Sequence, residues 1–208
     1  MRPGNALLNC MWRNCWGYPE PRYAWHFVPS NRRDYCRRLV SAASWFANSP
    51  TRMCALEVRG ALEGLAARRL AERGMTEEVR ERLKQCLVAG ESLLAKGYLE
   101  EGDITRWSQL NGDFHAAIIE STGSLVIADA IARNNHLPFA SADSIIIDNQ
   151  ALDKEYRKLH LAHQQHQLVF QALSHGESAR AEMLMREHAY IGLRYATLFG
   201  LDPKGARI

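Results

Sequence analysis

The feature that most constrains this 208-residue chain is the spacing of its apolar residues after Cys54. In ALEVRGALEGLAARRLAERG, apolar side chains recur every three or four residues, which is the period of a helix with one buried face. Later segments repeat this period, and no alternating strand pattern occurs after residue 54. The sequence therefore predicts an all-α domain, an antiparallel bundle of about six helices joined by short loops.

Capping residues and chain breaks give the expected helix ends. Thr76 can accept hydrogen bonds from the first N–H groups of a helix, and Gly74 and Gly123 can end the helices that precede them. A Ser-His-Gly break at 174–176 separates the last two helices, and the second of these is expected to end before Gly200. The expected helices are residues 55–74, 76–97, 103–121, 124–134, 151–174 and 177–199.

Residues 1–54 differ from the rest of the chain in composition. They hold four of the five cysteines, four of the five tryptophans, and eight arginines against two acids. Their apolar residues follow neither the helical nor the strand period, and prolines interrupt them. The net charge of +3 therefore comes from this segment and does not indicate a basic face on the helical domain. We expect an irregular segment over 1–54, a helical domain over 55–200 and a tail over 201–208.

Hydropathy argues against a membrane protein. No apolar run approaches the roughly 20 residues that span a bilayer, and the N-terminus lacks the apolar core of a signal peptide. We therefore expect a cytoplasmic protein with no membrane partner.

Three histidines and one asparagine form the strongest candidate site. Asn111 and His115 are four residues apart, so on a helix they project from one face, one turn apart. His166 and His188 lie on either side of the Ser-His-Gly break, so two antiparallel helices can bring their imidazoles to the same level. Three imidazole nitrogens and an amide oxygen suit a divalent transition metal, zinc before nickel, manganese or iron. The sequence predicts a metal site at these four residues.

Other polar residues in these helices receive a simpler interpretation. A single histidine on an apolar helix face is usually a core or boundary residue, and it is the repeated pattern that favours a metal. His163 is interpreted as a flank or surface residue of the helix that carries His166, with an outer partner of the metal site as the alternative. The remaining polar residues expected at the surface are Asp113, His136, His160 and His175.

The helical body resembles the FCD domain, the effector-binding half of FadR-subfamily GntR transcription regulators. The resemblance covers roughly residues 55–200 and rests on four motifs in order: LEVRGALEGLAARRLAERG, NGDFHAAIIESTGS, QHQLVFQAL and MLMREHAYI. The family's metal-ligand positions fall on Asn111, His115, His166 and His188. Asn111 stands at a position for an acidic or amide residue, so these four positions hold no carboxylate.

The resemblance also implies an effector and partners. Arg59 matches an arginine that faces the family's effector pocket, and a surface ion pair with Glu63, four residues later, is the alternative. A metal held by neutral ligands keeps its positive charge, so an anionic ligand fits it. The family points to small organic acids such as hydroxy acids or sugar acids. The resemblance further implies that the protein is a homodimer. It also implies that an intact homologue binds operator DNA.

A winged-helix DNA-binding head should precede such a domain, and residues 1–54 do not resemble one as they stand. With a one-base shift, the codons from Cys15 to Trp25 permit LGVSRTPVRLA, which resembles the recognition-helix motif of the GntR family. We therefore interpret residues 1–54 as a winged helix-turn-helix coding region read out of frame. We expect that no DNA-binding residues are intact in this segment. We also expect the chain to show weak or no operator-specific binding.

Two other functions fit the same residues. A metalloenzyme would need a general base beside a metal-bound water, but there is no H-E-x-x-H motif and no acid at a useful spacing from a ligand. We therefore expect no catalytic residues and no enzymatic activity. A non-functional, frameshifted regulator is the other alternative. The favoured function is a ligand-sensing domain that binds a small carboxylate at a divalent metal.

Overall fold

Six α-helices make up the part of the chain that the computed structural model describes, residues 50–135 and 152–191. These residues contain no strand, so the predicted all-α fold is confirmed. Most of the predicted irregular segment, His136 and the tail over 201–208 lie outside the described residues. The helices are α3 (Pro50–Arg73), α4 (Glu77–Leu94), α5 (Glu101–Ser121), α6 (Leu125–Asn135), α7 (Leu152–Ser174) and α8 (Ser178–His188).

Local sequence explains most of the helix ends. The side chain of Thr76 accepts a hydrogen bond from the backbone N–H of Val79 at 3.3 Å, which confirms its role as the cap of α4. Gly74 and Gly123 follow α3 and α5 with positive φ angles of 81° and 59°, a conformation that glycine adopts without strain. α3 begins at Pro50, within the segment predicted to be irregular, because proline suits the first helical position, where its missing N–H is not needed.

The last described helix is shorter than predicted. α8 ends at His188, and a turn covers residues 189–191 instead of the predicted continuation. The backbone N–H of Tyr190 bonds the carbonyl of Glu187, and that of Ile191 bonds the carbonyl of His188, so the chain tightens as it leaves the helix. Apolar residues continue through this turn, and their spacing therefore gave no sign of the helix end.

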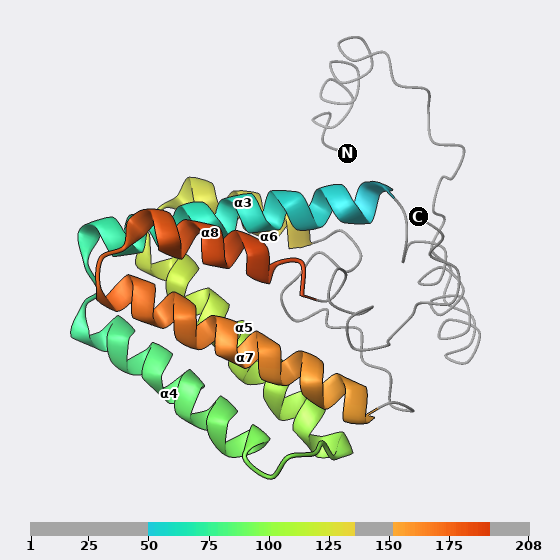
Figure 1. Ribbon diagram of the computed structural model, residues 1–208. Helices are drawn as coiled ribbons and strands as arrows, with labels where there is room; N and C mark the ends of the chain where they lie inside the picture. Colours follow the sequence, from blue (N-terminus) through green and yellow to red (C-terminus); the bar gives the residue numbers. More distant parts are fainter. Residues whose placement is uncertain (1–49, 136–151, 192–208) are drawn as a thin grey trace, which may run out of the picture. The chain divides into compact units, whose positions relative to one another are not determined.

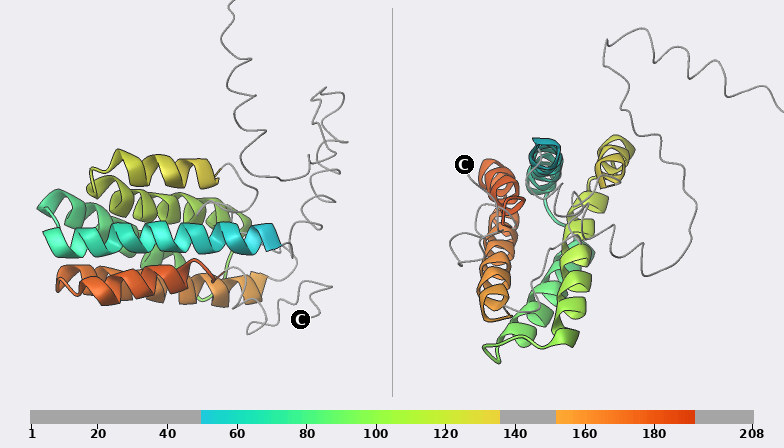
Figure 2. Two further views of the ribbon diagram at one scale, coloured as in Figure 1. Left: turned by 90° about the horizontal axis from the view of Figure 1, so that it is seen from above. Right: turned by 90° about the vertical axis from the view of Figure 1, so that its right-hand side faces the viewer.

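α3 packs against four other helices, α5, α6, α7 and α8. It runs beside α8 (Figure 1), and in the end-on view it lies between α8 and α6 (Figure 2). α5 and α7 lie below α3 in Figure 1 and contact it, and α4 packs against both of them. The side chains of α3, α5, α7 and α8 therefore meet in one interior.

Two glycines allow α3 and α8 to approach closely. A Cβ at Gly60 would lie 3.2 Å from both the Cβ of Ala189 and the carbonyl oxygen of Arg186. A Cβ at Gly64 would lie 2.7 Å from Cγ of Arg186 and 3.0 Å from the carbonyl oxygen of Glu182. Side chains at these positions would push the helices apart. The short distance between α3 and α8 matters because α8 carries His188 at its last residue.

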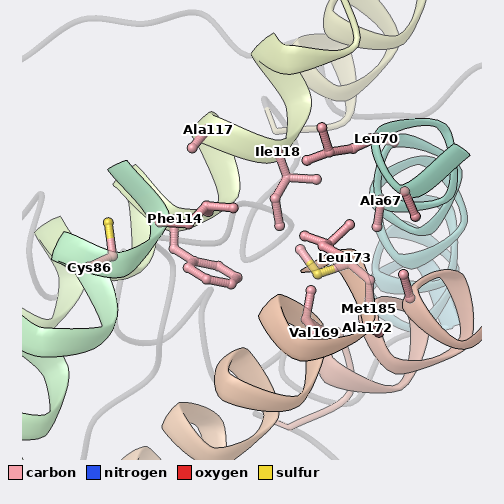
Figure 3. Packing of buried hydrophobic residues seen from close by; sticks show 14 of the residues in the cluster. Ala67, Leu70, Cys86, Phe114, Ala117, Ile118, Val169, Ala172, Leu173 and Met185 are labelled. Atoms are coloured by element: carbon pink, nitrogen blue, oxygen red, sulfur yellow. The ribbon is translucent and has the colours of Figure 1, made fainter. Parts of the chain in front are cut away.

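Apolar residues from all six described helices fill the interior, and many of them are drawn in Figure 3. Phe114 and Ile118 of α5 are fully buried among side chains of α3, α7 and α8, and Leu70 is buried on α3. Leu62 and Leu65 are partly buried against the same cluster, so the predicted core role of this leucine stripe is confirmed. A second, smaller cluster surrounds Trp107, which has no exposed surface. None of the described helices combines the length and the apolar character needed to cross a membrane.

Candidate metal centre

Three imidazoles from three helices meet in the interior. His115 comes from α5, His166 from α7 and His188 from the last residue of α8. Nε2 of His188 lies 3.2 Å from Nε2 of His115 and 3.0 Å from Nε2 of His166. One ligand atom from each of the three side chains lies within 4.8 Å of the others, and each residue is buried. The sequence prediction that these three histidines converge agrees with this geometry.

Asn111 lies one turn before His115 on α5 and is also buried, with 3 % of its surface exposed. A buried position on the helix face that carries His115 is what the prediction of a fourth ligand requires. A bond between its amide oxygen and a metal stays a prediction.

Two polar side chains form hydrogen bonds with the Nδ1 atoms of His115 and His188, the ring nitrogens that point away from the cluster. Oε2 of Glu63, on α3, lies 3.1 Å from Nδ1 of His115, and Oε1 of Gln165, on α7, lies 2.9 Å from Nδ1 of His188. A carboxylate and an amide oxygen only accept hydrogen bonds, so both Nδ1 atoms carry a hydrogen. For neutral rings, this leaves the Nε2 lone pairs of His115 and His188 directed into the cluster. Metal-binding histidines are commonly fixed in this way by an outer hydrogen bond.

The nitrogen spacing fits a shared ion. Metal–nitrogen bonds of about 2.0–2.1 Å place two ligand nitrogens about 2.8–3.4 Å apart at right or tetrahedral angles. The separations of 3.0 and 3.2 Å agree with this requirement. Two lone pairs that face each other across 3.2 Å with no hydrogen between them are unfavourable unless a cation or a proton lies between them. The donor set is therefore suited to a divalent transition metal.

Electrostatics keep the cluster in a form that can bind metal. Burial lowers the pKa of His166 well below its usual value, and the neighbouring imidazoles of His188 and His115 lower it further. Burial, followed by the effects of His115 and Arg59, likewise lowers the pKa of His188 well below its usual value. Both rings are therefore neutral near pH 7. Burial alone would raise the pKa of Glu63, but attraction to His115 and Arg59 and the hydrogen bond from His115 outweigh it, so Glu63 is ionised.

Aromatic rings fix the orientation of His166. The ring of Phe114 stacks on it at a centroid distance of 4.2 Å, and the indole of Trp107 lies nearly parallel to it at 6.1 Å. Both aromatic side chains are fully buried, so the imidazole of His166 has little freedom to turn. Phe114 lies on α5, one residue before His115 in the motif NGDFH. It therefore orients the ring of His166, which belongs to α7.

Arg59 is buried beside the cluster. Its Nε lies 3.7 Å from Oε2 of Glu63, and its Nη2 lies 3.5 Å from the carbonyl oxygen of Ala189. The ion pair with Glu63 that was the alternative interpretation is therefore present, but it is buried, because the two side chains are 8 % and 2 % exposed. Among the described residues, Nε of Arg59 has no hydrogen-bond partner. The role of Arg59 toward an effector stays a prediction.

Glu63 is the main residue that the sequence interpretation missed. The four predicted ligand positions hold no carboxylate, yet the carboxylate of Glu63 contacts His115 directly. A signal was available, because Glu63 lies seven residues from both Leu56 and Leu70 on the buried face of α3. A charged residue in the middle of a buried stripe is usually paired, and it can mark a functional site.

The prediction that His163 lies at the flank or surface was wrong. It is 2 % exposed, contacts the edge of Trp107, and pairs through Nε2 with Oε2 of Glu91 at 3.2 Å. The small size of Gly90 makes room for its ring, since a Cβ there would lie 2.6 Å from Nδ1 of His163. His160 and His175 are exposed, as predicted. Asp113, predicted at the surface, is partly buried and accepts hydrogen bonds from Gln109.

A pocket of ≈ 480 Å³ reaches the cluster from the side of α5. His115 and Glu63 form part of its wall, and Asp113 is the second acid in its lining. Thr105, Ser108 and Gln109 add groups that can bond to hydroxyls. Among the described residues, the lining includes two acids and neither a lysine nor an arginine, so its charge favours cations and hydroxyl groups over a free anion.

The described residues thus form an all-α domain with a buried three-histidine cluster and an adjacent polar pocket. Residues 54–190, more than half of the chain, match the FCD domain family, so the chain belongs to this family. The FCD domain is the C-terminal effector-binding domain of GntR-family regulators, which are regulatory proteins rather than enzymes. A comparison with curated proteins finds no match.

Proposed function

We propose that this FCD domain senses a small carboxylate through a divalent transition metal held by His115, His166 and His188, with Asn111 as the fourth ligand. The observation that carries the proposal is the convergence of three Nε2 atoms, with separations of 3.0 and 3.2 Å from His188. Hydrogen bonds to the outer nitrogens of His115 and His188 direct the lone pairs of those two rings inward. Zinc is the first candidate, and nickel, manganese and iron also accept these donors.

The bound metal would supply a positive charge to which a carboxylate can bind. The four protein ligands are neutral, so none of them compensates the charge of the metal. An ion with more than four coordination positions also keeps positions open for the carboxylate oxygens. Arg59 supports the same choice of effector, because it is a buried guanidinium beside the cluster whose Nε has only the ion pair with Glu63 at 3.7 Å and no hydrogen bond among the described residues. A carboxylate can accept from a guanidinium through two parallel hydrogen bonds.

The pocket lining favours an effector that also carries hydroxyl groups. Thr105, Ser108 and Gln109 can exchange hydrogen bonds with hydroxyls, while Glu63 and Asp113 disfavour a second anionic group. A hydroxy acid or a sugar acid combines one carboxylate with such hydroxyls. We therefore expect this class to bind more tightly than dicarboxylates of similar size.

We further propose that the domain serves a homodimeric regulator of the FadR subfamily of GntR proteins, located in the cytoplasm. In an intact homologue, effector binding would change the placement of two winged helices on operator DNA. For this chain we infer that residues 1–54 are an out-of-frame remnant of that head, and that operator-specific binding is weak or absent. The nucleotide sequence tests this inference, because stop codons or an unrelated peptide in the shifted frame would exclude it.

Metal analysis of the purified chain tests the main proposal. We expect about one zinc ion per chain after dialysis against a weak chelator, and loss of that ion from variants with alanine at His115, His166 or His188. A melting-temperature screen of small carboxylic acids, with and without zinc, should then find hydroxy or sugar acids that stabilise only the metal-bound protein. If the wild-type chain holds no metal, a metal-dependent sensor and a metalloenzyme are both excluded. The non-functional, frameshifted regulator would then be the function hypothesis that remains.

A further inference from the structure

Glu63 is a buried charged residue on the largely apolar inner face of α3. It is 1 % exposed, and its neighbours along α3 are the buried residues Ala66, Ala67 and Leu70. An ionised carboxylate in such a place destabilises the fold by several kcal/mol unless it is paired. Its partners are Nδ1 of His115 at 3.1 Å and, at a longer distance of 3.7 Å, Nε of Arg59. The shorter contact is therefore with the outer nitrogen of a proposed ligand.

The two outer partners of the cluster differ in charge. His115 has a carboxylate at its Nδ1, whereas His188 has the neutral amide of Gln165 at the same atom. The proposed ligand set of three imidazoles and Asn111 is itself neutral. A divalent ion within it would introduce two positive charges into a buried region, where attraction to an anion is stronger than in water.

We propose that Glu63, acting through His115, supplies the negative charge that Asn111 leaves out of the ligand set, and so sets the metal affinity of the site. This inference rests on the proposed metal-binding function. A carboxylate at the outer nitrogen makes an imidazole a better donor, and loss of such a partner typically weakens metal binding 10- to 100-fold. Glu63 is thus a positioning residue that contacts the ligand, while the metal bonds belong to other side chains.

Zinc affinity of the full chain tests the inference, measured by competition with a chromophoric chelator at pH 7.5. We expect Glu63→Gln, which keeps the shape and removes the charge, to weaken zinc binding by about 10- to 100-fold. Glu57→Gln is the matched control, because it removes a charge from an exposed position on the same helix and should leave the affinity within about twofold of wild type.

A second substitution separates charge from structure. Asn111→Asp places a carboxylate one helical turn from His115, so in the Glu63→Gln background it should restore most of the lost affinity. The gain in zinc affinity from Asn111→Asp should be larger in the Glu63→Gln variant than in the wild-type chain, because only the variant lacks the charge of Glu63. The cobalt(II) absorption spectrum should keep its band positions in Glu63→Gln, since the imidazole ligands are unchanged.

The outcomes distinguish the two proposals. If the wild-type chain binds no zinc, the proposed function fails and Glu63 is not the reason. If the wild type binds zinc and Glu63→Gln binds it equally well, or if Asn111→Asp does not rescue the variant, the inference about Glu63 is overturned. Should Glu63→Gln not fold, Asn111→Asp in the wild-type chain decides the matter. The inference expects little change in zinc affinity there, because Glu63 already supplies the charge, and a gain of about tenfold or more would overturn it.

Discussion

Oε2 of Glu63 lies 3.1 Å from Nδ1 of His115, although 52 residues separate them in the chain. The contact joins α3 to α5, and the same carboxylate oxygen lies 3.7 Å from Nε of Arg59. It fixes which nitrogen of His115 carries a hydrogen and therefore which nitrogen faces His166 and His188. The packing of α3 against α5 is thus part of the site.

Zinc should stabilise the wild-type fold and should not stabilise a variant that lacks one imidazole. At a zinc concentration 100 times the dissociation constant, the free energy of unfolding should rise by about 2.7 kcal/mol. His188→Ala should lose this gain, whereas His160→Ala, an exposed histidine on α7, should keep it. Urea denaturation with zinc and with chelator measures both. Equal stabilisation of wild type and His188→Ala would contradict the assignment of His188.

The stability of the metal-free protein should fall as the pH is lowered from about 6.5, the usual pKa of histidine. Burial lowers the folded-state pKa of both His166 and His188, so below pH 6.5 the unfolded chain binds more protons than the folded one. The free energy of unfolding therefore decreases with falling pH, by up to about 1.4 kcal/mol per pH unit for each histidine. The loss continues until the pH reaches the folded-state pKa values.

Urea denaturation between pH 7.5 and 5 in the presence of chelator measures this slope. His166→Gln, which cannot be protonated, should show a shallower slope, and the exposed His160→Gln should keep the wild-type slope. A stability that stays constant from pH 7 to 5.5 would mean that the two buried imidazoles titrate alike in the folded and unfolded chains.

The sequence predicted the fold and the three imidazoles because both depend on local spacing. The helical period gave the six helices, and the four-residue spacing of Asn111 and His115 placed them on one face of α5. The contact of Glu63 with His115 depends on how α3 packs on α5, which no local pattern specifies. The burial of His163 was missed for the same reason, because it depends on Gly90 of α4 leaving room for the ring.

Gly90→Ala should destabilise the fold. Its Cβ would lie 2.6 Å from Nδ1 and 2.8 Å from Cε1 of His163, a ring already held by Trp107 and Glu91. Relief requires a shift of α4 away from α7, and overpacking of this kind costs about 1–3 kcal/mol. Gly102→Ala on α5 is the control, since nothing lies within 4 Å of its Cβ and alanine favours a helix by up to about 1 kcal/mol. Urea denaturation should show opposite effects for the two substitutions.

Gly64→Ala should weaken zinc binding even though Gly64 lies far from the metal ligands in sequence. The added Cβ would lie 2.7 Å from Cγ of Arg186 and 3.0 Å from the carbonyl oxygen of Glu182, so α8 must move away from α3. Because His188 is the last residue of α8, this movement should misplace its Nε2. We expect a loss of zinc affinity of about tenfold, which corresponds to about 1.4 kcal/mol.

Arg186→Ala provides the matched control and a rescue of that effect. Alone, it removes an exposed side chain and should leave the zinc affinity near the wild-type value. Combined with Gly64→Ala, it removes the 2.7 Å contact and leaves only the 3.0 Å contact with the backbone, so part of the affinity should return. Chelator competition measures all four proteins. Wild-type affinity in Gly64→Ala alone would show that the position of His188 does not depend on the close packing of α3 and α8.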